Sequence, residues 1–180
     1  MTLLYYIAVF EAEDDTKLTP AQKARRHARA ASKLKSLLPR LSGVDSKMRL
    51  RIRNEYYWFS HQPLKQYNLG REMVGKGIKR SYYSQGVGAI ELAESYIKSG
   101  QRGLAFRWAK KSEAAWLEFF KVDDQWFNSY FFYAIALGLQ GRDDEMKAAL
   151  ETSRKIAGKP KNWIAIREML EHIAELRSLI

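Results

Sequence analysis

A glycine-rich segment that ends near a lysine is the first place in this chain where nucleotide chemistry could be expected. Residues 70–77 match the spacing of the phosphate-binding loop as far as Lys76. That loop also needs a Ser or Thr after the lysine, to bind magnesium, and a buried strand before it. Gly77 has no hydroxyl, and residues 62–68 do not have the pattern of a strand. The sequence therefore predicts no nucleotide site and no cofactor.

Metal-binding and catalytic side chains are scattered along the chain. The three histidines, His27, His61 and His172, lie far apart, and none has a second His at metal-ligand spacing. The chain has no cysteine, which removes disulfides, thiolate zinc ligands and thiol nucleophiles together. Neither a serine nucleophile motif nor a catalytic pair of carboxylates is present. We therefore expect no metal site, no catalytic residue and no enzymatic activity.

Aromatic side chains interspersed with Lys and Arg are a third source of chemistry. Single-stranded nucleic acids bind to basic grooves in which bases stack on aromatic rings. The other interpretation, which we favour, is that these rings pack helices against one another. The residues concerned are Tyr56, Tyr57, Trp58, Tyr67, Tyr82 and Tyr83.

Positive charge is concentrated in the first half of the chain. Residues 1–16 hold four acids and no Lys or Arg, whereas residues 17–80 hold 17 Lys and Arg against three acids. Residues 81–180 hold 14 Lys and Arg against 13 acids and are nearly neutral. The net charge of +11 therefore belongs to the first half, where an acidic partner or a nucleic acid would bind.

A helix over residues 20–41 is expected to carry the clearest basic surface. Thr19, Pro20 and Gln22 form an N-terminal capping signal, and Ser42–Gly43 ends the helix unless Pro39 ends it earlier. Alanines and leucines gather on one side. The opposite side forms either a solvated face or a contact surface for an acidic partner, and its candidate basic patch is Arg26, Arg29, Lys33 and Arg40.

The apolar segment Leu3–Phe10 is compatible with a short strand or with the first turns of a buried helix, and we lean towards a helix. It is too short to span a bilayer, and no basic residue precedes it as in a signal peptide. We therefore expect a cytoplasmic protein.

Residues 45–74 are expected to form a helix that opens at Asp45 and, after the turn at 61–63, a partner helix over Leu64–Val74. Five of the eleven glycines lie in residues 70–88, which predicts a hinge or irregular junction. Further helices are expected at about 85–99, 102–118, 124–139, 142–157 and 161–178.

One pattern occurs twice between residues 85 and 160. When Gly100 is aligned with Gly141, Ala93 aligns with Ala134, and the offset is 41 residues. The other aligned pairs are Leu92 with Tyr133, Tyr96 with Leu137, Ala105 with Met146 and Ala109 with Leu150. Each unit is a helix, a tight turn at glycine and a second helix packed on the first. Repeats of this length indicate stacked helical hairpins.

At these residues the chain resembles the tetratricopeptide repeat family. Leu92, Ala93, Tyr96, Gly100 and Ala105 stand at that family's spacing, as do Ala134, Leu137 and Gly141, followed by Pro160. The unit is longer than the family's 34 residues, Met146 replaces a small residue, and the family's early Trp is missing. Residues 45–74 match faintly, as a degenerate first repeat.

The resemblance implies a concave groove lined by the first helix of each unit. The matching positions here are Val87, Ile90, Glu94, Lys98, Asn128, Phe131 and Ile135. The apolar members of this set are equally compatible with a simple core role. Only Lys98 and Asn128 match the Asn and Lys set that grips a peptide carboxylate in some members, so that grip is not expected.

The sequence as a whole predicts one all-α domain over residues 1–180, a short right-handed stack of antiparallel helical hairpins resembling tetratricopeptide repeats. Its parts are a basic half (17–80), two clearer repeats (85–160) and a capping helix (161–180). The leading hypothesis is a non-catalytic scaffold that binds a protein or peptide, which an acidic partner would suit. The alternative is a nucleic-acid-binding module that uses the basic half. Docking on an anionic membrane through residues 20–41 ranks third, and an enzyme last.

Overall fold

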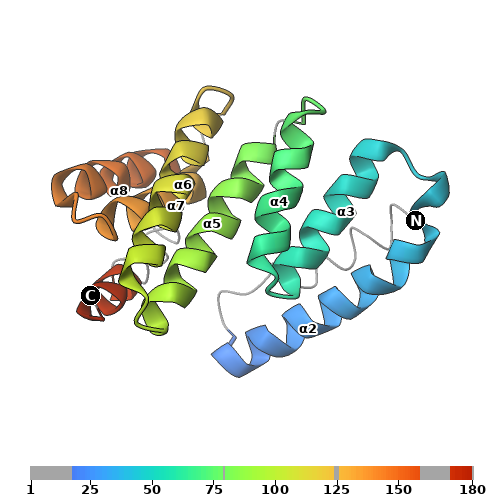
Figure 1. The fold of residues 1–180 in the computed structure, drawn as a ribbon, viewed down its shortest axis with the longest axis horizontal. Helices are drawn as coiled ribbons and strands as arrows, with labels where there is room; N and C mark the ends of the chain where they lie inside the picture. Colours follow the sequence, from blue (N-terminus) through green and yellow to red (C-terminus); the bar gives the residue numbers. More distant parts are fainter. Residues whose placement is uncertain (1–17, 79, 124–125, 159–170, 180) are drawn as a thin grey trace.

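The computed structural model describes residues 18–78, 80–123, 126–158 and 171–179. Every regular element in these ranges is a helix, which confirms the all-α prediction (Figure 1). The segment Leu3–Phe10, Pro160 and residues 161–170 lie outside the described residues. The helices are α2 (Pro20–Leu37), the 3-10 helix η1 (Leu38–Gly43), α3 (Ser46–Phe59), α4 (Pro63–Val74), α5 (Ser81–Lys98), α6 (Arg102–Phe120), α7 (Phe127–Gly138) and α8 (Asp143–Ala157), followed by helical residues 171–178.

The helix starts in the first half follow local capping signals. The Thr19 hydroxyl accepts a hydrogen bond from the Gln22 N–H, and the Gln22 side chain accepts one from the Thr19 N–H, as the capping box predicts. The Asp45 carboxylate accepts the two backbone N–H groups of Lys47 and Met48 at 2.9 and 3.0 Å. These contacts confirm both predicted starts.

The helix expected over 20–41 is in fact two elements. Helix α2 ends at Leu37, and the chain continues as the 3-10 helix η1 to Gly43. Pro39 has no N–H to donate to the carbonyl four residues earlier, so the α-helical ladder stops before it. The tighter winding still buries Leu41.

Three turns between consecutive helices have the same geometry. Each contains one residue with positive φ: His61 at 50°, Gly100 at 75° and Gly141 at 73°. In each turn the backbone N–H of the next residue donates a hydrogen bond to the carbonyl five residues earlier. These bonds are Gln62 to Tyr57 at 2.9 Å, Gln101 to Tyr96 at 2.8 Å and Arg142 to Leu137 at 3.1 Å. This is the hydrogen bond of a Schellman turn. The α3–α4 turn is therefore built like the α5–α6 and α7–α8 turns.

The irregular junction predicted within the glycine-rich stretch 70–88 is confined to the connection between α4, which ends at Val74, and α5, which begins at Ser81. Gly70 lies inside α4, and α5 begins at Ser81, so that Gly86 and Gly88 lie within it. A Cβ on Gly88 would stand 2.7 Å from the Pro63 carbonyl oxygen and 2.9 Å from the Tyr67 nitrogen. Gly70 and Gly88 therefore let the backbones of α4 and α5 touch, and Gly86 makes room for the Trp116 ring of α6, tertiary needs that outweigh the low helix propensity of glycine.

The core is divided into a large cluster and smaller ones. The large cluster joins α5 to α8, includes the fully buried Ala93 and Ala134, and also takes in Ile173 and Leu176 of residues 171–178. A smaller cluster joins α2, η1 and α3 around Leu34. In Figure 1, α3, α4 and α5 stand side by side, and α2 lies obliquely across one end of the row. The first helices of the hairpins, α3, α5 and α7, are thus held in fixed relative positions.

Candidate binding cleft

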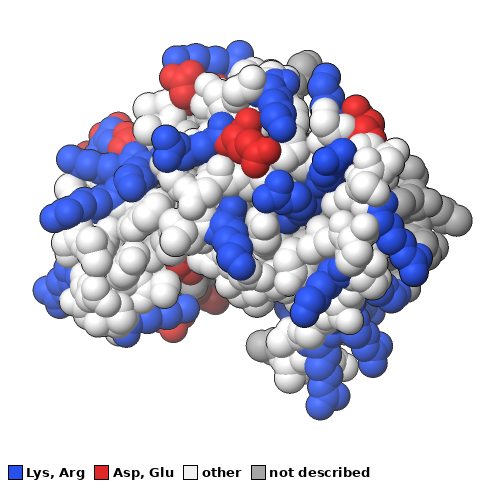
Figure 2. Space-filling view, turned by 45° about the vertical axis from the view of Figure 1, so that its right-hand side comes forward, with Lys and Arg blue, Asp and Glu red and all other residues white. Residues whose placement is uncertain are grey.

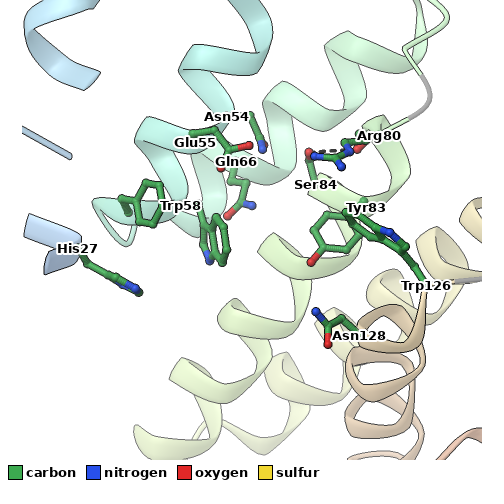
Figure 3. A pocket seen from close by; sticks show the side chains of 11 residues that line it. His27, Asn54, Glu55, Trp58, Gln66, Arg80, Tyr83, Ser84, Trp126 and Asn128 are labelled. Atoms are coloured by element: carbon green, nitrogen blue, oxygen red, sulfur yellow. Dashed lines mark hydrogen bonds between the residues drawn. The ribbon is translucent and has the colours of Figure 1, made fainter. Parts of the chain in front are cut away.

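A cleft of about 460 Å³ opens between the first helices of the three hairpins. Its lining comes from five parts of the chain, as Figure 3 shows. The residues are His27 of α2; Asn54, Glu55, Trp58 and Phe59 of α3; Gln66 of α4; Arg80, Tyr83 and Ser84 at the start of α5; and Trp126 and Asn128 at the start of α7.

Two buried amide groups face this cleft without a partner. Gln66 is only 1% exposed, and neither its Oε1 atom nor the buried Oδ1 atom of Asn54 accepts a hydrogen bond from the residues that the structure describes. Figure 3 shows the Gln66 amide and the Tyr83 hydroxyl pointing into the space between the α3 side and the α5 side. Buried amide oxygens almost always have a partner, so two unpartnered oxygens in residues that line one cleft are an unusual feature.

Aromatic rings form the opposite wall. Tyr83 makes edge-to-face contacts with Trp126 and Trp116, each with 5.3 Å between ring centroids. The Arg80 guanidinium lies 4.6 Å from the centre of the Trp126 ring, within the range of a cation–π interaction. Because Trp116 is completely buried, it fixes Tyr83, and Tyr83 in turn positions the exposed Trp126. The wall is therefore largely preformed.

The groove predicted from the sequence coincides with this cleft at one residue only. Asn128 lines the cleft, whereas four other members are 1–3% exposed and belong to the core: Val87, Ile90, Phe131 and Ile135. Helices α5 and α7 pack directly on their neighbours through these side chains, which leaves no open surface there. These four residues are therefore part of the core, which was the second interpretation of the sequence.

The remaining two predicted groove residues lie where the C-terminal helical residues cover α5. The His172 Nε2 atom is 3.1 Å from the Glu94 carboxylate, and this hydrogen bond raises the pKa of His172, with smaller opposing effects from burial and from Lys98. Burial raises the pKa of Glu91 to about 7, with the Glu94 carboxylate as the second cause. Lys98 is exposed. Residue 172 and its neighbours thus cover the Glu94 end, and the open cleft lies at the Asn128 end.

The predicted basic patch is at the surface of α2 and η1. Arg29, Lys33 and Arg40 are exposed, and Arg26 is partly buried. Figure 2 shows Lys and Arg side chains over much of the visible side of the molecule, in both halves, with fewer Asp and Glu among them.

Several lining residues were not predicted, although the sequence carries a signal for two of them. When the three turns are aligned on His61, Gly100 and Gly141, Asn54 takes the place of Ala93 and Ala134, and Gln66 takes the place of Ala105 and Met146. All four counterparts are buried apolar residues. The signal for these two lining residues is therefore a polar side chain at a position that is apolar in the other repeats. This signal is visible only when the first repeat is aligned with the others on its turn.

No protein-family model matches this chain, and no curated protein or solved structure matches it either. Within the described ranges, no group of three or more His, Asp or Glu side chains is placed to hold a metal ion. No helix among the described residues is long and apolar enough to cross a membrane.

Proposed function

We propose that this chain is a non-catalytic helical-repeat module, with tetratricopeptide-like architecture, that binds an extended peptide segment of a protein partner in the cleft between α3, α5 and α7. The observation that carries the proposal is the pair of amide oxygens of Asn54 and Gln66, which are buried without a partner among the described residues, in side chains that line a cleft walled by aromatic rings.

The repeat architecture is supported by the similar geometry of the α3–α4, α5–α6 and α7–α8 turns. His61, Gly100 and Gly141 have positive φ and the same following hydrogen bond, at spacings of 39 and 41 residues along the sequence. The helix pairs α5–α6 and α7–α8 are in extensive contact, and α5 also contacts α7. In a stack of hairpins the first helices line one common side, and α3, α5 and α7 all contribute to the cleft.

A peptide backbone suits this lining chemically. A side-chain amide offers one acceptor and two donors, and a peptide bond offers the complementary donor and acceptor. The rings of Trp58, Tyr83 and Trp126 supply large apolar surfaces with polar edges, the side chains that most often anchor protein interfaces. An extended segment can use both at once, because its backbone reaches the amides while alternate side chains meet the rings.

The test replaces the two amides with the residues that the other repeats carry. Peptides are selected from a random library against the protein, and their affinities are measured by calorimetry for the double variant Asn54→Ala, Gln66→Met. Because each lost hydrogen bond contributes about 1 kcal/mol, affinity should fall by about tenfold or more. The variant should melt at the same temperature or higher, since two unpartnered polar groups leave the core.

The matched control is Asn68→Ala, which removes an exposed amide from α4 outside the cleft and should leave affinity unchanged. Selected peptides that bind the double variant as tightly as the original protein would show that the cleft is not the binding site. A library that yields no binding peptide would contradict the proposal altogether.

A further inference from the structure

A second hollow, of about 380 Å³, lies at the basic end of the molecule between η1 and α3. It is lined by apolar side chains, one hydroxyl, two arginines and one aromatic ring, and no carboxylate of the described residues lines it. The lining residues are Leu38, Pro39, Leu41, Ser42, Arg49, Arg53 and Tyr57. Tyr57 is one of the aromatic residues that the sequence analysis considered for base stacking. The next residue, Trp58, lines the peptide cleft instead.

The cations at this hollow are held around the Tyr57 ring. The Arg53 guanidinium and the Lys65 ammonium lie 6.0 and 5.9 Å from its centre. Arg49 donates a hydrogen bond to the Val44 carbonyl at 3.2 Å, which holds its side chain over the connection between η1 and α3. Two positive charges from two helices thus lie near one partly exposed ring, and Arg49 adds a third at the same hollow.

The negative charge nearby does not balance them. Glu72 lies 3.7 Å from Arg53, and the same carboxylate also pairs with Lys76 at 3.2 Å. Neither Arg49 nor Lys65 has a carboxylate within ion-pair distance among the described residues. The adjoining sequence adds to the excess, because residues 17–44 contain eight Lys and Arg and no acid, and Arg40 is exposed on η1 itself.

We propose that this hollow, with Lys65 beside it, binds a single-stranded nucleic acid, with phosphates at Arg49, Arg53 and Lys65 and an unpaired base at Tyr57 and the apolar lining residues. Phosphate contacts explain the surplus of cations, and base stacking explains an aromatic ring at their centre. An acidic peptide would use the cations but does not require an aromatic ring beside them, whereas every nucleotide carries a planar base. A duplex would present phosphates but keeps its bases stacked inside. The hollow is separate from the peptide cleft.

The test measures fluorescence anisotropy of a labelled single-stranded 12-nucleotide oligouridylate against the full chain at several salt concentrations. Three phosphate contacts predict a slope of log K against log salt of about −2. The double variant Arg49→Gln, Arg53→Gln should lower affinity by about tenfold or more at low salt and make the slope shallower. Tyr57→Leu keeps an apolar side chain against its neighbours Leu50, Leu69 and Met73 and should cost about tenfold through lost stacking.

The matched control is the double variant Arg107→Gln, Lys110→Gln, which removes the same charge from exposed positions on α6. It should bind the oligonucleotide nearly as well as the original protein. An equal loss in the control would show generic attraction to a basic protein and overturn the proposal. So would polyglutamate that competes as well as unlabelled oligouridylate while Tyr57→Leu has no effect, because an acidic protein surface would then be the occupant. Absence of binding at low salt would also overturn it.

Discussion

The two halves of this molecule use their charges differently. In α5–α8, charged groups are paired with one another: Arg142 forms ion pairs with Glu113 and Glu145, and Arg177 pairs with Asp143 at 2.7 Å. In the first half, 17 Lys and Arg of residues 17–80 face only three acids. The second half therefore nearly balances its charges in sequence and pairs several of them within the fold, whereas residues 17–80 carry an excess of positive charge that suits an acidic partner.

The halves also differ in how their helices pack. The core of α5–α8 is one continuous cluster that includes residues 173 and 176, while the first half has smaller clusters around Leu34 and Leu50. The seam between them, α4 against α5, is tight because Gly70 and Gly88 bring the backbones together. The comparison indicates a compact half that supplies rigidity and a basic half that supplies binding surface, joined by the direct contact of α4 with α5.

The largest expected effect comes from disturbing the seam with Gly88→Ala. The added Cβ would lie 2.7 and 2.9 Å from backbone atoms of Pro63 and Tyr67, so α4 and α5 must move apart. We expect a net loss of about 2–3 kcal/mol in the free energy of unfolding, even after the gain in helix propensity. Urea denaturation followed by circular dichroism measures it.

Gly103→Ala is the matched control for this change. Gly103 lies in α6 with nothing within 4 Å of its added Cβ, so the variant should be more stable by about 0.5–1 kcal/mol. Gly88→Ala should also weaken peptide binding in the cleft, because the cleft is lined by helices on both sides of the α4–α5 contact. Binding of the oligonucleotide in the hollow between η1 and α3 should stay unchanged. Equal stability of the two variants would show that the seam is loose.

The sequence predicted the helices better than their packing. Capping residues such as Thr19 and Asp45, and the turn glycines Gly100 and Gly141, act through neighbours a few positions away, so local reasoning finds them. The glycines at 86 and 88 were predicted to lie in a hinge or irregular junction, because their contact with another helix is not visible in the local sequence. Periodicity shows that one side of a helix is apolar, but it does not show whether that side meets a core or a groove.

The cleft was harder to predict than the fold, for the same reason. Its lining residues come from α2, α3, α4, α5 and α7, and no spacing within one segment brings them together. The first half was aligned to the repeats only faintly, because His61 stands where the other turns have glycine. Once that turn is recognised, Asn54 and Gln66 stand out as polar residues at core positions.

A smaller effect is expected from pH and should come from the second half alone. Burial raises the pKa of Glu91 from 4.5 to about 7, and the hydrogen bond to Glu94 raises the pKa of His172. Both groups bind protons more tightly in the folded state. The contribution of these two groups to the free energy of unfolding is therefore greatest at low pH, and it falls as the pH rises through their folded-state pKa values. The loss attributable to Glu91 between about pH 4.5 and 7 should be on the order of 2 kcal/mol.

Glu91→Gln should remove most of this slope, which is the fall in the free energy of unfolding with rising pH, because the variant has no carboxyl to ionise. The part of the slope that is due to His172 should remain. Glu118→Gln, which breaks an exposed ion pair with Lys121, should keep the full slope. Denaturation curves at pH 5, 6, 7 and 8 separate the two variants. A slope that persists in Glu91→Gln would place its origin outside the cluster of Glu91, Glu94 and His172.

The smallest effect tests the charge comparison itself, by reversing one exposed cation in each half. In α2, Arg29 has like charges four residues away on both sides, Arg25 and Lys33, so Arg29→Glu creates two favourable pairs. In α8, Lys147 has Asp143 and Glu151 at the same distances and lies 4.0 Å from Asp144, so Lys147→Glu places like charges together. We expect Arg29→Glu to stabilise and Lys147→Glu to destabilise the protein, each by about 0.5–1 kcal/mol at low salt.

Both changes should shrink as salt is added, because exposed charges are screened beyond about 3 Å in 1 M salt. Thermal melts of the two variants at 20 mM and 1 M sodium chloride measure the difference. The opposite signs are the essential result, since they follow from unbalanced charge in one half and balanced charge in the other. If both reversals destabilise the protein equally, Arg29 has a stabilising partner in the folded state, and the surface of α2 is less available to an external ligand than the charge distribution indicates.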